Sequence, residues 1–146
     1  MRTQRTLVLM LAATLGLPVS GFDARPVMAE EIIIANPAFD VESVDAKTLG
    51  RVFLGKTSRL EGEKVEVVVL QEGSATHANF LTSYVKRNPK QFLSHWRKLC
   101  FSGKGILPKA FETEEELVAH VAATPGAIGY ISKSTPHEDV KVIRIQ

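Results

Sequence analysis

The chain has 146 residues, 45% of them hydrophobic, and its 18 Lys and Arg side chains nearly balance 16 Asp and Glu side chains. This length accommodates one compact domain behind a leader, but not two domains. No run of Lys and Arg with interleaved aromatic residues occurs, which excludes a general nucleic-acid-binding surface. Cys100 is the single cysteine, so the chain has no internal disulfide and depends on its core for stability.

The N-terminal segment has the pattern of a secretory signal peptide. Two arginines precede an apolar run over residues 7–17, and small residues precede a cleavage site after Ala29 or further upstream near Ser20. We therefore expect residues 1–29 to be a signal peptide and residues 30–146 to form a single secreted domain. An uncleaved N-terminal anchor is the alternative. The 117 residues of 30–146 carry 15 basic and 15 acidic side chains, so the expected mature chain has a net charge near zero.

The first strand and helix are predicted between residues 32 and 55. Residues 32–35, Ile-Ile-Ile-Ala, form a continuous apolar run, which is typical of a strand buried on both faces. The apolar spacing after Ser43 predicts a helix with Ser43 as N-cap and Gly55 as its end. Gly50 lies inside this pattern and weakens the prediction of one unbroken helix. Residues 58–63 are polar and are predicted to form a loop.

Residues 65–80, with the sequence VEVVVLQEGSATHANF, are the centre of the chain. A run of β-branched residues ends at Leu70, meets Gly73 and passes directly into a helical pattern. This predicts a strand, a tight turn and a helix N-terminus. The first backbone N–H groups of a helix have no partners within the helix, and the helix dipole adds a partial positive charge. Such a junction can therefore hold an anion.

The predicted binding residues follow from this junction. They are the turn formed by Gly73, Ser74, Ala75 and Thr76, which we call the 73–76 turn, and His77 in the first turn of the helix. The hydroxyl groups of Ser74 and Thr76 would add donors to the backbone amides. Two alternatives remain open: Ser74 can serve only as the N-cap of its own helix, and His77 can be a surface histidine without a role.

The remaining pattern alternates between helices and strands. The helix after the 73–76 turn ends at Asn88-Pro89, a second amphipathic helix follows, and the segment 101–111 is predicted to be a long loop. Thr113 and Glu116 form a capping box that opens another helix, and strands are predicted over residues 127–131 and 140–145. Mixed strands and helices indicate a three-layer α/β domain. Ligands in such domains bind at the carboxyl ends of strands, where the 73–76 turn falls.

Three segments carry a resemblance to a known family. They are residues 52–56 (VFLGK), residues 73–76 (GSAT) and residues 124–130 (TPGAIGY). In this order the segments resemble those of the substrate-binding proteins of phosphate ABC transporters, within the periplasmic binding protein superfamily. The resemblance covers residues 31–145 but only the second lobe of a full member. It implies a single three-layer lobe of the periplasmic binding protein type, with a central mixed or mostly parallel sheet flanked by helices.

The resemblance also implies a weakened phosphate site. Ser74 and Thr76 match positions whose hydroxyl and backbone N–H groups bind phosphate in the family. Ala75 replaces a glycine, Glu72 replaces an aspartate, and Leu70 replaces an arginine. The loss of a guanidinium removes a strong charge-assisted contact to the anion. With the opposing lobe also absent, the resemblance implies weak phosphate binding at best.

We therefore expect a non-enzymatic, periplasmic or secreted binding module for phosphate or a similar oxyanion, without catalytic residues. The scattered histidines and the lone cysteine form no zinc spacing, so no metal site and no cofactor are predicted. The expected partners are a membrane transporter or sensor protein, or a second copy of the chain. The alternative function is an accessory or sensory protein-interaction module. Phe92, Trp96 and Phe101 are predicted in the core, with a partner-binding patch of these aromatics or Tyr130 as the alternative.

Overall fold

The computed structural model describes residues 30–146. The predicted signal peptide, residues 1–29, lies outside the described residues. A six-stranded sheet has the order β2-β8-β1-β7-β5-β6. Its strands are β1 (Glu31–Ala35), β2 (Ser43–Val44), β5 (Glu66–Leu70), β6 (Lys109–Phe111), β7 (Ala127–Ser132) and β8 (Lys141–Ile145).

The sheet is mixed. Strand β5 runs parallel to both β6 and β7, and β2 runs parallel to β8. Strand β1 pairs antiparallel with both β7 and β8. The fold class expected from the sequence, an α/β lobe with a mixed central sheet flanked by helices, is confirmed.

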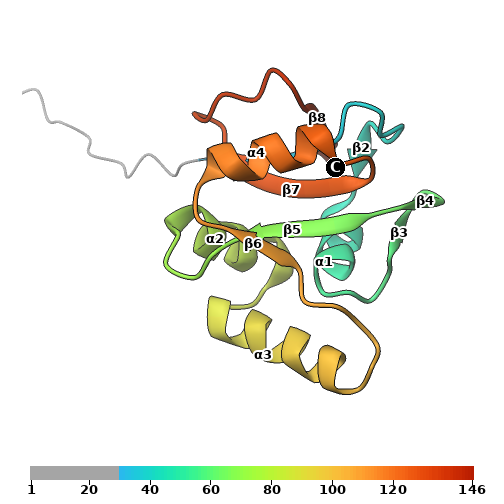
Figure 1. Cartoon of the computed structure of the whole chain (residues 1–146), viewed down its shortest axis with the longest axis vertical. Helices are drawn as coiled ribbons and strands as arrows, with labels where there is room; N and C mark the ends of the chain where they lie inside the picture. Colours follow the sequence, from blue (N-terminus) through green and yellow to red (C-terminus); the bar gives the residue numbers. More distant parts are fainter. Residues whose placement is uncertain (1–29) are drawn as a thin grey trace, which may run out of the picture.

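Helices cover both faces of this sheet. Figure 1 shows α4 on one side, with α1 and α2 on the other and α3 beyond α2. The helical segments are α1 (Ala46–Phe53), α2 (Ala75–Phe80), the π-helix η1 (Leu81–Val85), α3 (Pro89–Phe101) and α4 (Glu114–Ala123). Within residues 30–146, no helix has both the length and the apolar character needed to cross a membrane.

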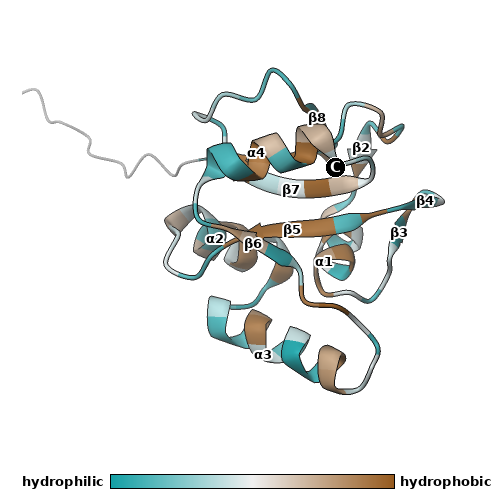
Figure 2. Ribbon diagram, viewed as in Figure 1, coloured by the Kyte–Doolittle hydropathy of each residue, from teal (hydrophilic) through white to brown (hydrophobic). Residues whose placement is uncertain are grey.

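The core lies between the sheet and its helices. All six residues of β7 are buried, and Ile33, Ile34 and Ala35 of β1 are fully buried, as their continuous apolar run predicts. Strand β5 is hydrophobic along most of its length, whereas α3 and α4 alternate between hydrophobic and hydrophilic residues (Figure 2). This alternation is typical of helices that pack one face against a core.

The start of α1 differs from the prediction. Ser43 belongs to β2, where it pairs with Arg144 of β8, and the N-cap is Asp45. The Asp45 carboxylate accepts a hydrogen bond from the backbone N–H of Thr48 at 2.9 Å. Serine and aspartate both cap helices well. Asp45 is the cap because Ser43 is held in β2 by its pairing with β8, which is distant in sequence.

Two predicted loops contain short strands. Strands β3 (Arg59–Leu60) and β4 (Glu63–Lys64) form a small hairpin in the segment predicted as a polar loop. The segment 101–111 ends in β6, which pairs with β5 at the edge of the sheet. Both strands of the hairpin and β6 are only two or three residues long, and their pattern is too short to be read from sequence.

Gly50 does not interrupt α1. A Cβ atom at this position would lie 2.8 Å from the backbone oxygen of Tyr84 in η1. Glycine therefore allows the backbones of α1 and η1 to approach each other closely.

Candidate functional site

The 73–76 turn lies at the carboxyl end of β5, where the sequence places it. Gly73 has a φ of +98°, which favours glycine, and Ser74 is the N-cap of α2. The Ser74 hydroxyl accepts a hydrogen bond from the backbone N–H of His77 at 3.2 Å. A hydroxyl that accepts a hydrogen bond can still donate its own proton, so capping leaves Ser74 able to contact a ligand.

The second hydroxyl of the turn, that of Thr76, already contacts a carboxylate. Thr76 is 9% exposed, and its Oγ1 donates a long hydrogen bond of 3.5 Å to Oε2 of Glu114. The other oxygen of Glu114 accepts from the backbone N–H of Ser132 at the end of β7. An internal anion thus already contacts part of the predicted anion site. Sequence reasoning missed Glu114 because its position depends on how α4 packs against the sheet.

His77 is buried, and the alternative of a surface histidine is wrong. Its exposed fraction is 3%, and burial lowers the pKa of His77 to about 4. Its ring lies edge-on to Phe92, with 5.8 Å between the ring centroids. A neutral imidazole cannot supply the positive charge that Leu70 lacks.

The hydrogen bonds of Tyr130 define the tautomer of His77. The Tyr130 hydroxyl accepts from the backbone N–H of Leu70 at 3.0 Å and also contacts Nδ1 of His77. Tyr130 is fully buried, and Nδ1 of His77 is the one acceptor that contacts its hydroxyl within residues 30–146, so the hydroxyl donates its proton to Nδ1. The proton of the neutral imidazole is therefore on Nε2. This Nε2 makes no hydrogen bond within residues 30–146 and is not among the unpaired side-chain atoms that are shielded from solvent.

Three of the four aromatic residues discussed in the sequence are core residues. Phe92, Trp96 and Tyr130 are buried, and Tyr130 stacks on Phe80 with 3.9 Å between the ring centroids. Phe101, in contrast, is 92% exposed at the end of α3, so its predicted place in the core is wrong. Burial also raises the pKa of Tyr130, which keeps its phenol protonated.

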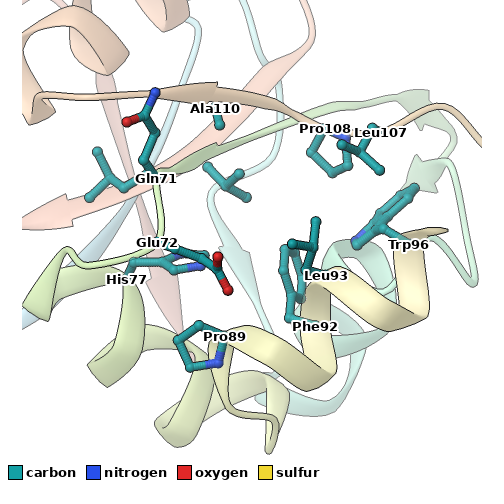
Figure 3. A pocket seen from close by; sticks show the side chains of 12 residues that line it. Gln71, Glu72, His77, Pro89, Phe92, Leu93, Trp96, Leu107, Pro108 and Ala110 are labelled. Atoms are coloured by element: carbon teal, nitrogen blue, oxygen red, sulfur yellow. The ribbon is translucent and has the colours of Figure 1, made fainter.

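A cavity of about 340 Å³ lies next to the 73–76 turn, between β5, β6 and α3 (Figure 3). Nine of its twelve lining residues are apolar, and the three polar ones are Gln71, Glu72 and His77. Figure 3 shows His77 and Glu72 at one end, with Trp96 and Leu107 at the other. Among the described residues, no group of three or more His, Cys, Asp or Glu side chains is placed to hold a metal ion.

Several solved structures share this arrangement of elements with the chain. A structure from Clostridium perfringens, described as a phosphate ABC transporter substrate-binding protein with bound phosphate, matches with a TM-score of 0.64 and 17% identity, over 79% of this chain and 44% of that chain. An ABC-type phosphate transport receptor from Vibrio cholerae matches with a TM-score of 0.59 and 16% identity, over 79% and 45% of the two chains. PstS from Borrelia burgdorferi matches with a TM-score of 0.58 and 12% identity, over 80% and 47%. The chain shares its fold with phosphate-binding proteins.

The resemblance found in the sequence is thus confirmed at the level of the fold. The chain spans less than half the length of each of these three structures. No protein-family model matches the sequence, and no curated protein matches it significantly. What the chain binds must therefore be argued from its own residues.

Proposed function

We propose that this chain is a non-enzymatic binding module of the periplasm whose 73–76 turn binds phosphate or a similar oxyanion weakly. The observation that carries the proposal is the position of the turn, at the carboxyl end of β5 and the start of α2, in a fold shared with phosphate-binding proteins. The Ser74 hydroxyl and the first backbone N–H groups of α2 are the proposed donors.

Three features of the site limit the proposed affinity. Leu70 provides no cation, and His77 is neutral near pH 7. Glu114 places a negative charge against Thr76, where an incoming anion would be repelled. A dissociation constant of about 1 mM, or a binding free energy of about −4 kcal/mol, is the expected range.

Calorimetry of residues 30–146 with phosphate, sulfate and acetate tests the proposal. The decisive variant is Glu114→Gln, which keeps an acceptor for Ser132 and removes the negative charge. We expect it to bind phosphate about tenfold more tightly, equivalent to about 1.4 kcal/mol of relieved repulsion. Glu115→Gln is the matched control, because Glu115 is exposed on the same helix turn and makes the same change in net charge.

Comparing the Glu114→Gln and Glu115→Gln variants distinguishes an effect of the site from an effect of net charge. An equal gain in both variants would attribute the effect to net charge and not to the site. Absence of heat with about 10 mM phosphate for the natural chain and for Glu114→Gln would refute oxyanion binding. The fold assignment would not be affected.

A specific observation also favours the alternative, an accessory or sensory interaction module. Phe101 and Ile106 are 92% and 89% exposed, and α3 with the segment that follows it forms one end of the molecule (Figure 1). Residues 73–111 contain seven Lys and Arg residues and no Asp or Glu. Exposed large apolar groups among positive charges fit a partner protein with an acidic, partly apolar surface.

Crosslinking in periplasmic extract tests this alternative. A transporter or sensor protein captured by the natural chain and lost in the double variant Phe101→Ser, Ile106→Ser would support it. Capture of the same proteins by both chains would contradict it. Solution scattering of the purified chain would identify homodimerisation, the third arrangement expected from the sequence.

A further inference from the structure

The cavity beside the 73–76 turn has the composition of a small-molecule site. Its volume is about 340 Å³, at the lower end of the range for ligand pockets, which are mostly apolar with a few polar groups at fixed positions. Phe92 and Trp96 provide aromatic surface from α3, and Val69 and Leu70 provide aliphatic surface from β5. Such surface favours a flat, apolar ligand over a hydrated ion.

One polar donor is held in this apolar wall. His77 is 3% exposed and lines the cavity. Its Nδ1 is occupied by Tyr130, so the proton lies on Nε2, and Nε2 has no partner within residues 30–146. Within residues 30–146, the unpaired side-chain atoms shielded from solvent are Oε1 of Glu31 and Nε2 of His120, so water can reach the Nε2–H group of His77. A ligand that offers an acceptor at this end of the cavity can take the place of that water at the Nε2–H group.

We propose that the cavity between β5, β6 and α3 binds a small, uncharged, planar compound with a carbonyl group, whose oxygen accepts a hydrogen bond from Nε2 of His77. This cavity adjoins the proposed oxyanion site and shares His77 with it, but binding of a neutral compound does not require that the 73–76 turn bind an oxyanion. The ligand's rings or acyl groups pack between the Phe92 and Trp96 side chains and the end of β5.

The charge of the lining selects against anions. The cavity lining contains no Lys or Arg, and Glu72 adds a carboxylate beside His77 (Figure 3). A carboxylate or phosphate ligand would lose its hydration and face a negative charge, without a cation in compensation. A neutral carbonyl oxygen loses far less hydration and is well matched by a single N–H donor.

Three probes of similar shape test the proposal: acetophenone, isopropenylbenzene and benzoate. Isopropenylbenzene replaces the carbonyl oxygen of acetophenone by a CH₂ group, and benzoate adds a negative charge. Trp96 is the single tryptophan and lines the cavity, so its indole N–H signal in ¹⁵N–¹H spectra reports binding. We expect acetophenone to bind about fivefold more tightly than isopropenylbenzene. Benzoate is expected to leave the signal unchanged.

Two variants locate the binding. His77→Phe keeps an apolar ring and removes the donor, so the preference for acetophenone over isopropenylbenzene should disappear. Ala110→Phe places a large side chain in the cavity lining from an exposed position on β6, leaves Trp96 as the single tryptophan, and should abolish binding of both neutral probes. Ile106→Ala is the matched control, since Ile106 is exposed nearby and does not line the cavity.

The proposal is overturned by any of three results on the natural chain. These are no Trp96 shift with about 10 mM acetophenone, equal binding of acetophenone and isopropenylbenzene, or binding of benzoate as tight as that of acetophenone. Unchanged binding of acetophenone by Ala110→Phe would also overturn it, because binding would then lie outside the cavity.

Discussion

The burial of His77 predicts a pH dependence of folding stability that can be assigned to one residue. Burial lowers its pKa from 6.5 to about 4. Between these values the unfolded chain takes up a proton that the folded chain does not. The contribution of His77 is therefore complete above about pH 6.5, is lost as the pH falls from about 6.5 to 4, and does not change further below that.

The size of this effect follows from the shift. Each pKa unit corresponds to about 1.4 kcal/mol, so the free energy of unfolding should fall by about 2 to 3 kcal/mol across the window. Urea denaturation between about pH 7.5 and 4.5 measures it, and the loss should move the midpoint by about 1 M or more. The lowered pKa values of Glu42 and Asp45 act mainly below about pH 4.5 and are common to all variants.

Two variants test whether the burial of His77 causes this pH dependence. His77→Phe should be less stable at neutral pH, because it loses the hydrogen bond with Tyr130, but its stability should be nearly flat across the window. Tyr130→Phe removes the same hydrogen bond while His77 remains buried, so it should keep the slope. A slope in His77→Phe equal to that of the natural chain would refute the assignment. A flat profile in Tyr130→Phe would show that the hydrogen bond, and not burial, lowers the pKa.

Further predictions concern two closely packed glycines and a buried amide, all measured as free energies of unfolding. Gly50→Ala gains about 1 kcal/mol of helix propensity, but its Cβ would lie 2.8 Å from the backbone oxygen of Tyr84, so a net loss of about 1 to 3 kcal/mol is expected. Gly55→Ala should cost about 2 kcal/mol or more, because φ is +69° and its Cβ would lie 2.7 Å from the Trp96 ring. A neutral or stabilised variant at either position would contradict the close approach that requires glycine there. Asn36→Leu should cost about 3 kcal/mol, since the buried Asn36 amide donates to two carbonyl oxygens at the end of α4 at 3.0 and 3.1 Å; a loss below about 1 kcal/mol would mean that water replaces it.

Local features of the chain were predictable because they depend on neighbouring residues. The apolar run of β1, the Ser74 cap of α2 and the Thr113 cap of α4 are present as expected. A cap joins residues three apart, and a buried strand needs only a short apolar run. The sequence pattern at residues 124–130 also pointed to the fold that the solved structures share.

Features that depend on distant pairing were not predictable. Ser43 pairs with a strand about a hundred residues later, which leaves Asp45 as the cap of α1. Strand β6 exists because it adds to the edge of β5. Phe101 lies at the end of an apolar helix face, yet no element within residues 30–146 covers it. Periodicity identifies the face of a helix that prefers burial, but it does not say where that burial ends.

The sequence by itself determined that a strand, a tight turn and a helix N-terminus occur at residues 65–80, because these depend on local propensity and capping. Only the tertiary structure decided the chemistry around them. Glu114, from α4, places a carboxylate on Thr76, and Tyr130, from β7, contacts Nδ1 of His77 beside an apolar cavity, while burial keeps the imidazole neutral. These groups lie 38 and 53 positions away in the chain. The charge and the hydrogen bonds of a side chain depend on the groups that pack against it in space. The spacing of residues along the chain does not reveal those groups.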